Sequence, residues 1–507
     1  MKLNQLKTGA LLSYLLIGLS SFISILYTPI MLRLLGQSEY GLYSLVASVV
    51  AYLGLFNFGF GSAYIKYFSV YKATNDNDGL ARLNGMFLII FSALGAVAVA
   101  AGLVLVVNSD SVFGNELTVV ELAKAKILMA IMVANIAITF PTIVFNSYIS
   151  AKEKFIFQKS LLIIKTIANP LVIIPVLLMG YGSVGMALIV TALGLIIELI
   201  NIWFCYKKAA IQFIFSKFDT KQLKELFIFS SFIFMNLVVN QINWNVDRFI
   251  IGWYRGTIEV AVYSIAAQLN TYFLTFSTAI SNVYIPRVNE MVARKCSNWE
   301  LTELFGRLGR LQFIVLALVI GLLVFFGIPF ITLWAGPNYS RSYYMALLLI
   351  IPVTIPLIQN LGIEIQRAKN QHKFRSWVYL FIAVGNIFIS IPLTKLYGGI
   401  GAALGTSIAL TIGNILIMNW YYHKKVGLDI VYFSKQIVQL LPAMVISGII
   451  GYLFMHFFNL HFVPNFILFA TLFIGIYGIS IWFLALNQYE KELIKKPILK
   501  LKSKLKH

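Results

Sequence analysis

Long apolar segments alternate with short polar ones along this chain, and that alternation is the strongest constraint on its fold. A helix that crosses the hydrocarbon core of a bilayer needs about 20 mostly apolar residues. Runs of that length recur from residue 8 to residue 486 of the 507 residues. Because lipid offers backbone polar groups no partners, such runs must be helical. The sequence therefore predicts an all-α integral membrane protein.

The composition agrees with many spans instead of one buried core. Hydrophobic residues make up 59% of the chain and charged residues 12%, against about 25% in soluble domains, and the mean hydropathy is +0.84. Residues 8–33 lead directly into another apolar run, so we expect a first span there instead of a cleaved signal peptide. We predict fourteen transmembrane helices, at 8–33, 40–66, 83–107, 121–148, 159–179, 184–206, 226–251, 259–285, 304–333, 341–363, 375–395, 400–423, 436–458 and 464–486.

The cations fix the expected topology. Alternate polar segments, starting with residues 1–7, hold 32 of the 40 lysines and arginines. Cytoplasmic loops carry such an excess, so both termini are expected in the cytoplasm. The net charge of +21 is spread over these loops without an aromatic-interleaved basic domain, which argues against nucleic acid as a partner. The basic tail 487–507 is expected to lie on the anionic inner leaflet of the bilayer.

An internal repeat divides the spans into two sets of six. "GLYSLVAS" (41–48) recurs as "AVYSIAAQ" (261–268), and "YGSVGMAL" (181–188) recurs as "YGGIGAAL" (397–404). The order and the spacing of about 217 residues predict two pseudo-symmetric lobes related by an axis along the membrane normal. We expect a six-helix lobe at 1–206, a cytoplasmic linker at 207–225, a second lobe at 226–423, two extra helices at 436–486 and the cytoplasmic tail at 487–507.

A polar stripe marks the predicted seventh span. Asn236, Asn240, Asn243 and Asp247 fall within about 60° of one another at 100° per residue. Amides and carboxylates avoid hydrocarbon, so this face must meet protein or water. One interpretation is a water-filled cavity between the two lobes, and the other is a hydrogen-bonded contact between helices.

Cations stand where several spans end. Lys66 and Arg287 lie at predicted inner ends, and Arg33 and Arg248 at predicted outer ends. They are either ordinary helix-end anchors or the two mouths of a cationic cavity. The second interpretation suits a phosphate, which arginine binds as a fork and lysine as a point charge.

Two further charges lie inside predicted spans. Lys165 is about two turns into its span and could reach the inner surface by snorkelling. Glu198 is nine residues from Lys207, and snorkelling is harder from there. With Asp247, Glu198 is a candidate for coupling transport to an ion.

No motif for catalysis, a cofactor or a metal stands out. The five histidines lie in predicted loops or at the terminus, and the sequence has no phosphate-binding GxxxxGK[ST] loop, HExxH or GxSxG. We therefore predict neither an enzyme nor a cofactor. A membrane-embedded polysaccharide polymerase stays a weaker alternative, since the longest predicted outer loop has only about a dozen residues around 108–118.

Several segments in order resemble one family. "LGQSEYGLYSL", "DRFIIGWYRGTIEVAVYS" and "YGGIGAALGTSIA" are similar to the Wzx-type oligosaccharide flippases of the multidrug/oligosaccharidyl-lipid/polysaccharide exporter superfamily. The resemblance covers nearly the whole chain. It implies a MATE-like pair of six-helix lobes in the bacterial cytoplasmic membrane and alternating access of a cationic central cavity.

The same resemblance implies the cargo and the partners. The cargo would be an O-antigen or other polysaccharide repeat unit on undecaprenyl pyrophosphate, moved from the inner to the outer leaflet by a monomeric transport unit. A polysaccharide polymerase and a chain-length regulator would be its partners. Asn236, Asn240, Asn243 and Asp247 would line the cavity, and the substrate-binding cations would be Lys66, Arg287, Lys165, Arg33 and Arg248.

Two branches of the superfamily are alternatives. Lipid II flippases carry an Arg-Asp pair in the first span, where this chain has Tyr27 and Thr28. Cation-coupled drug exporters place a carboxylate in the first lobe. The first span lacks one, but Glu198 keeps that alternative open.

Overall fold

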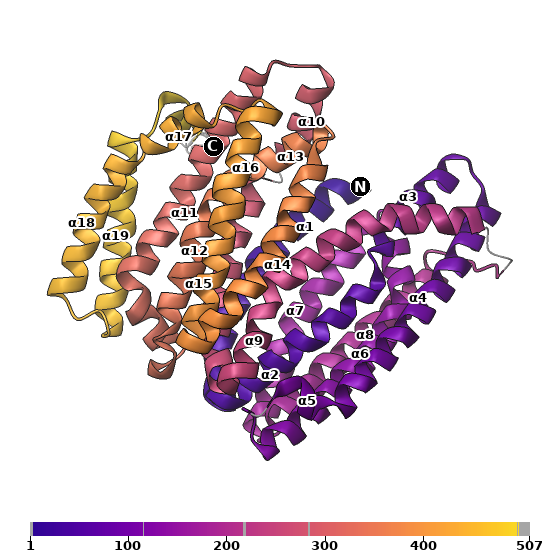
Figure 1. Ribbon diagram of the computed structural model, residues 1–507. Helices are drawn as coiled ribbons and strands as arrows, with labels where there is room; N and C mark the ends of the chain where they lie inside the picture. Colours follow the sequence, from indigo (N-terminus) through magenta and orange to yellow (C-terminus); the bar gives the residue numbers. More distant parts are fainter. Residues whose placement is uncertain (1–3, 115, 216–219, 282–283, 494, 496–507) are drawn as a thin grey trace, which may run out of the picture. The chain divides into compact units, whose positions relative to one another are not determined.

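Helices form all the regular structure in the described part of the protein (Figure 1). The structure is a computed structural model that describes residues 4–114, 116–215, 220–281, 284–493 and 495. No strand occurs within these ranges, so the predicted all-α class is confirmed. The chain forms two compact units, one of residues 1–264 with 390–402 and the other of residues 265–389 with 403–507.

The helices up to the unit boundary follow the predicted spans closely. Their bounds are α1 Gln5–Leu35, α2 Gln37–Val50, the 3-10 helix η1 Ala51–Asn57, α3 Phe60–Ala73, α4 Asn77–Val107, α5 Ser109–Phe113, α6 Val119–Ala151, α7 Phe155–Leu178, α8 Gly182–Lys207 and α9 Thr220–Ser281. The predicted span 40–66 is broken, because η1 ends at Phe58 and Gly59, which both have left-handed backbone angles.

The later helices include several breaks. Their bounds are α10 Ile285–Ala293, α11 Asn298–Trp334, η3 Pro337–Tyr339, α12 Ser342–Ile358, α13 Asn360–Ala368, α14 His372–Tyr397, α15 Gly399–Leu410, the π-helix η4 Thr411–Ile417, α16 Met418–Tyr421, the π-helix η5 Tyr422–Val426, α17 Ile430–Val438, α18 Leu441–Phe457 and α19 Val463–Leu484. The predicted spans 341–363 and 436–458 are each bent by about 40° between two helices.

The predicted count of fourteen spans is not confirmed. Within the described residues, 11 helices are long and apolar enough to cross a bilayer, or up to 13 if each bent pair is one span. The difference lies in α9, a single helical stretch of 62 residues with a non-helical kink at Gly256. The predicted span 226–251 and most of the predicted span 259–285 fall in it.

The first part of α9 belongs to unit 1 and packs within it. Phe234 contacts the Phe58 ring with centroids 4.6 Å apart, and Phe227 meets Phe60 edge-on at 5.1 Å. The repeat instead assigns this segment to the second lobe, so the lobe boundaries stay a prediction. Because α9 begins at Thr220, the last residues of the predicted linker 207–225 are helical, and residues 216–219 lie outside the described ranges.

The backbone repeats with nearly the same spacing as the sequence motifs. Left-handed backbone angles recur at matched positions of the two halves, although most of these positions share no residue type. The pairs are Gly36 and Gly256, Asn75 and Lys295, Glu153 and Asn370, Gly182 and Gly398, and Ala210 and Gly427. Two pseudo-symmetric halves therefore exist at the level of the backbone.

Equivalent carboxylates bind equivalent helix starts. The Glu39 carboxylate accepts a hydrogen bond from the Ser183 backbone N–H at 2.7 Å, where α8 begins. Glu259, the counterpart of Glu39 in the repeat, accepts one from the Gly399 N–H at 2.9 Å, where α15 begins. Negative charge at a helix N-terminus satisfies free N–H groups and opposes the helix dipole. The repeat thus preserves an interaction that the motifs alone did not reveal.

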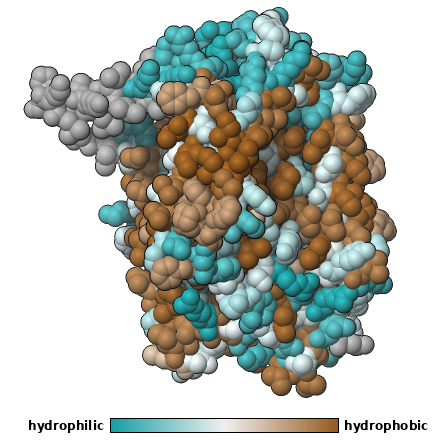
Figure 2. Space-filling model, turned by 90° about the vertical axis from the view of Figure 1, so that its left-hand side faces the viewer, coloured by the Kyte–Doolittle hydropathy of each residue, from teal (hydrophilic) through white to brown (hydrophobic). Residues whose placement is uncertain are grey.

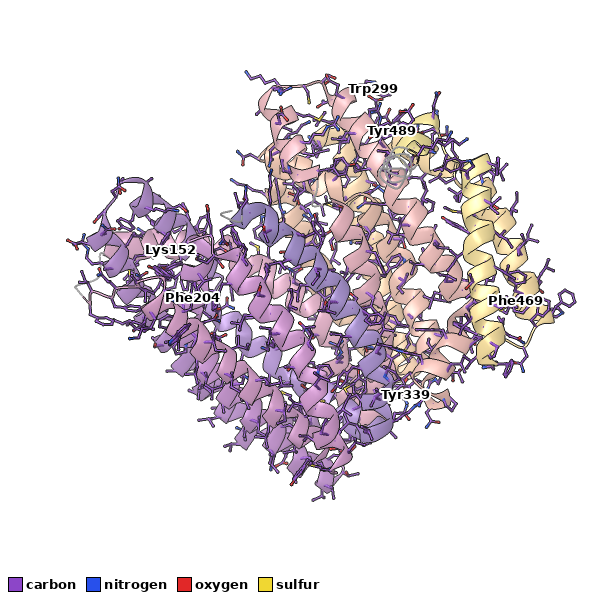
Figure 3. The ribbon with its side chains drawn as sticks, turned by 180° about the vertical axis from the view of Figure 1, so that it is seen from behind. Lys152, Phe204, Trp299, Tyr339, Phe469 and Tyr489 are labelled. Atoms are coloured by element: carbon purple, nitrogen blue, oxygen red, sulfur yellow. The ribbon has the colours of Figure 1, made fainter. Side chains whose placement is uncertain are left out.

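Equivalent lysines fasten the opposite ends of the halves. Lys152 Nζ donates to the Ala209 carbonyl at 3.3 Å, and Lys369 Nζ donates to the Val426 carbonyl at 2.8 Å. The two lysines, like the two carbonyls, are counterparts in the repeat. Burial lowers the pKa of both lysines. Figure 3 shows Lys152 beside Phe204, at the end of unit 1 where α8 also finishes.

Unit 2 carries a broad hydrophobic band over α18 and α19, which lie side by side in Figure 1. Figure 2 shows this face, with hydrophilic residues gathered at its upper end. Large apolar side chains on it are exposed, including Ile449, Ile467 and Phe483. Such a surface is stable against lipid and not against water.

A buried ion pair joins α11 to the end of the chain. Arg310 and Glu490 are both 2% exposed, and Arg310 Nε lies 2.7 Å from Glu490 Oε1. The remaining guanidinium hydrogens bind the Gln436 and Ala485 carbonyls and the Gln439 side chain. The charge is therefore fully paired, which a buried cation requires. Of the predicted tail 487–507, residues 494 and 496–507 lie outside the described ranges.

We predict that Glu490→Ala destabilises the protein strongly, because it leaves a buried guanidinium without its counter-charge. Removal of one partner of such a pair costs about 3–5 kcal/mol. Thermal unfolding of the purified protein measures the effect. The matched control is Glu303→Ala, which removes the exposed partner of Arg307, and equal losses from both variants would contradict the prediction.

Candidate functional site

The polar stripe of α9 changes from exposed to buried along its length. Asn236 and Asn240 are exposed, Asn243 is half-buried and Asp247 is buried. All four lie in unit 1. The stripe therefore does not form one continuous dry contact, and its amides are open at the end that the charge pattern places inside.

The buried end of the stripe is held by a tyrosine from beyond the kink. Tyr263 donates its hydroxyl to Asp247 Oδ2 at 2.5 Å, and Asp247 is 2% exposed. Gly256, with φ 75° and ψ −173°, lies between them and turns the chain. Asp247 therefore connects the two arms of α9.

Arg248 forms hydrogen bonds to residues on both sides of the same kink. Its guanidinium donates to the Asn245 side chain at 3.0 Å, to the Trp244 carbonyl at 3.4 Å and to the Ser264 hydroxyl at 3.3 Å. Ser264 lies on the far arm of α9, one residue after Tyr263. Arg248, which was predicted as a cation of the outer mouth, therefore also stabilises the bend.

A cluster of hydrogen-bonded polar side chains lies at one end of unit 1, around this bend. The Glu121 carboxylate at the start of α6 accepts hydrogen bonds from the Ser38 and Thr257 hydroxyls, both at 2.7 Å. A Cβ on Gly41 would lie 1.8 Å from the Thr257 carbonyl oxygen. Only glycine permits α2 to approach the second arm of α9 so closely. Gly41 lies in the repeated motif "GLYSLVAS", but the repeat does not predict this contact.

The other predicted cations lie on four different helices. Lys66, on α3, is exposed, and its ammonium lies 4.3 Å from the centroid of the Phe229 ring of α9. Arg33 on α1 and Arg287 on α10 are exposed, and Lys165 on α7 is half-buried. Among the described residues none of these four forms an ion pair. Their positive charges are thus available to an anion.

Glu198 lies in a small amide cluster between α6 and α8. The Asn146 side-chain amide donates to both carboxylate oxygens, at 2.9 and 3.2 Å. Asn201 in turn donates to the Asn146 carbonyl oxygen at 2.8 Å. Within the described residues Glu198 has no cationic partner. An acidic side chain at the centre of a span raises the free energy of insertion by about 2.5–3.5 kcal/mol. The two hydrogen bonds from the Asn146 amide offset part of that cost.

A pocket of about 320 Å³ lies farther along the same helices. It is formed by α2, η1, α6 and α8, and its polar lining groups are Tyr43, Asn135 and Thr191. Thr191 is two turns before Glu198 on α8. On α6, Asn135 and Asn146 lie within about 20° of each other on the helix face. Polar side chains therefore follow the contact between α6 and α8 from the pocket to the carboxylate.

Three partners in these clusters were not predicted from the sequence. Tyr263 lies in the repeated motif "AVYSIAAQ", where it served only as a landmark. Asn146 and Asn201 are amides within apolar spans, and Asn201 follows Glu198 by one helical turn. Polar side chains within a span avoid hydrocarbon, and this rule applies to both amides. Each of them is a single polar residue and forms no stripe on its helix, so the periodicity that identified the α9 stripe does not identify them.

Comparison with known proteins finds a matching family and a curated relative. The family model described as "Polysaccharide biosynthesis protein" matches residues 6–292. A curated relative, "Putative O-antigen transporter" of Shigella flexneri, is 23% identical over 399 residues, which cover 77% of this chain and 91% of that protein.

Two solved structures share the fold. The lipid II flippase MurJ in an inward closed conformation aligns with a TM-score of 0.72 and 17% identity, over 97% of this chain and 99% of that one. An inward-facing multidrug transporter of the MATE family aligns with a TM-score of 0.60 and 14% identity, over 82% of this chain and 96% of that one. These likenesses establish the transporter fold, with its MATE-like arrangement.

We predict that Tyr263→Phe destabilises the folded state, because the buried Asp247 side chain loses the hydrogen bond that the Tyr263 hydroxyl donates to it. Such bonds contribute about 1.5–3 kcal/mol. Thermal unfolding of the purified variant measures the loss. Tyr254→Phe is the matched control on the same helix, and a similar melting temperature for both variants would show that the Asp247 contact contributes little.

Proposed function

Because the chain belongs to the polysaccharide biosynthesis protein family and is a membrane transporter of the multidrug/oligosaccharidyl-lipid/polysaccharide superfamily, we propose that it is an oligosaccharide flippase. Its cargo is an oligosaccharide unit on undecaprenyl pyrophosphate. It carries this unit from the cytoplasmic to the outer leaflet of the bacterial cytoplasmic membrane by alternating access through a cationic central cavity. Both termini lie in the cytoplasm.

The α9 stripe carries this proposal. A sugar unit presents many hydroxyl groups, and amides can both donate to and accept from them. Asn236 and Asn240 are exposed in a segment that is otherwise apolar, and an exposed amide is far more stable beside water or a polar cargo than beside hydrocarbon. The half-buried Asn243 continues that surface toward the kink, where the buried Asp247 holds the bend. The stripe therefore lines the path of the sugar.

Cations provide the second part of the cargo site. The pyrophosphate carries negative charge, which lysine and arginine attract. Lys66, Arg287 and Lys165 receive it at the cytoplasmic mouth, and Arg33 and Arg248 meet it at the outer mouth. The absence of ion pairs at Lys66, Arg33, Lys165 and Arg287 in the described structure supports this role. The lipid tail stays in the bilayer.

A cation-coupled multidrug or lipid II exporter of the same superfamily is the second candidate. The observation that favours it is Glu198, a carboxylate inside α8 that accepts hydrogen bonds from an amide and pairs with no cation in the described structure. An embedded acid of this kind suits a cationic drug as well as an ion.

For the flippase, a polysaccharide polymerase and a chain-length regulator would act on the product, and the transport unit would be a monomer.

We predict that Asp247→Ala and Lys66→Ala each abolish surface polysaccharide while the protein still inserts into the membrane. The first change removes the carboxylate that holds the bend at the buried end of the stripe, and the second removes a cytoplasmic cation that attracts the pyrophosphate. Immunoblots of surface glycan and of membrane fractions measure the two quantities. Lys72→Ala, at another exposed lysine of α3, is the control that should leave polymer unchanged. Normal polymer from both test variants would remove these roles.

Deletion of the gene separates the two candidate functions. For the flippase we expect surface glycan to disappear and the undecaprenyl-linked unit to accumulate, because that unit cannot reach the outer leaflet. Lipid extraction followed by mass spectrometry identifies the intermediate. Intact glycan together with greater sensitivity to cationic dyes would support the exporter instead.

A further inference from the structure

We propose that the start of the C-terminal tail forms a binding site for one anionic phospholipid. Lys491 and Lys495 hold its phosphodiester group beside the indole of Trp482, and its acyl chains lie along α19. The site belongs to unit 2 alone. It goes beyond the proposed function, because its ligand is a resident of the bilayer and not the cargo of transport.

A short helical turn after α19 places the two lysines. α19 ends at Leu484, and the backbone is helical again over residues 488–493. Asn487 and Glu490 begin this turn as a reciprocal pair. The Asn487 N–H donates to Glu490 Oε2 and the Glu490 N–H donates to Asn487 Oδ1, both at 2.9 Å. Two backbone N–H groups at the start of the turn are thus satisfied locally.

The buried Arg310 fixes this turn against the rest of unit 2. The carboxylate that begins the turn, Glu490, is also the partner of the Arg310 guanidinium at 2.7 Å. Arg310 donates to the Ala485 carbonyl as well, also at 2.7 Å. The turn cannot rotate about its own axis without breaking a buried ion pair, which would be costly. The faces of the turn that point away from Arg310 therefore have defined positions.

Two lysines on one such face gather around a single indole. Lys491 and Lys495 are four residues apart, so they project from the same side of a helix. Their ammonium nitrogens lie 6.0 and 5.8 Å from the centroid of the Trp482 ring. Lys491 is half-buried and Lys495 is exposed. Attraction to the ring holds each ammonium group in place, but it leaves both positive charges uncancelled.

No carboxylate offsets these two charges in the part of the chain that the structure describes. The ion pairs there join other lysines, arginines and a histidine to acids, and Glu490 is already bound to Arg310. Like charges one helical turn apart repel each other. An anion that contacts both ammonium groups removes this repulsion. The arrangement of Lys491 and Lys495 therefore favours an anionic ligand.

The surroundings favour an anion that carries acyl chains. Phe483 and Leu484, next to Trp482 in the last turn of α19, are both exposed. They continue the hydrophobic band of α18 and α19 up to the end where Figure 2 shows hydrophilic residues. A phospholipid matches both parts of this surface, with its phosphodiester group for the lysines and its acyl chains for the apolar side chains. A free phosphate would leave the apolar part uncovered.

Aromatic and basic side chains surround the site at the same end of unit 2. The Arg307 guanidinium lies 5.3 Å from the centroid of the Tyr489 ring, and the Trp299 and Tyr432 rings lie 4.8 Å apart. Figure 3 shows Trp299 and Tyr489 at this end. Tryptophan and tyrosine are enriched at the depth of the lipid headgroups. In the sequence, residues 496–507 add five lysines and no acidic residue, which strengthens the attraction to an anionic leaflet.

Native mass spectrometry of the full-length protein, delipidated in detergent, tests the site. Phosphatidylglycerol and phosphatidylcholine with the same acyl chains are titrated separately. We expect the unchanged protein to prefer phosphatidylglycerol, and Lys491→Gln combined with Lys495→Gln to weaken that binding about 30-fold, because two cations near the headgroup are lost. The control combines Lys424→Gln with Lys425→Gln. It removes two exposed lysines of unit 2 and should keep the preference.

Three results would overturn the proposal. The unchanged protein could bind both lipids equally, or the two double variants could lose phosphatidylglycerol equally, which would mean that net charge acts without a defined site. Glycerol phosphate, which lacks acyl chains, is the third ligand. Displacement of the lipid by an equal concentration of glycerol phosphate would identify a soluble phosphodiester as the ligand instead. No glycan is present in these titrations, so their outcome is independent of the transport assignment.

Discussion

The cost of placing a polar group in hydrocarbon governs this structure. Lipid offers no hydrogen bonds, so each amide or charge inside a span needs a partner from the protein or from water. Asp247 meets that requirement through Tyr263, Arg310 through Glu490, and Glu198 through Asn146. The asparagines at the open end of the α9 stripe are exposed instead of buried, and that exposure is the reason for placing a wet path beside the helix.

The repeat organises how these groups are satisfied. Glu39 and Glu259 bind equivalent helix starts, and Lys152 and Lys369 bind equivalent carbonyls. Each pair lies near the ends of long helices, where free backbone groups remain. The halves thus share their end contacts, whereas their embedded charges differ, since the second half has no acidic residue at the position equivalent to Glu198. The contacts at the helix ends therefore follow the repeat, whereas the embedded charges of the candidate sites do not.

Hydropathy and motif spacing predicted the helical class, the positions of most spans and the repeat, because lipid imposes those features on the sequence directly. They could not predict that α2 gives way to a 3-10 helix at Ala51 or that α9 continues through Gly256, since both depend on packing between distant segments. The same holds for the site. The periodicity of Asn236 to Asp247 identified one face of a helix, but the Tyr263 hydrogen bond depends on a bend that periodicity does not encode.

The central claim is that the inner half of the α9 stripe borders water. Single cysteines at Asn236 and Asn240, in a protein with Cys296 replaced by serine, test it through their reaction with a charged, water-soluble thiol reagent in native membranes. A cysteine at Val238, about 200° around the helix from Asn236, is the control. The account predicts rapid labelling at 236 and 240 and slow labelling at 238. Labelling at 236 and 240 as slow as at 238 would place the stripe against lipid or protein and contradict the account.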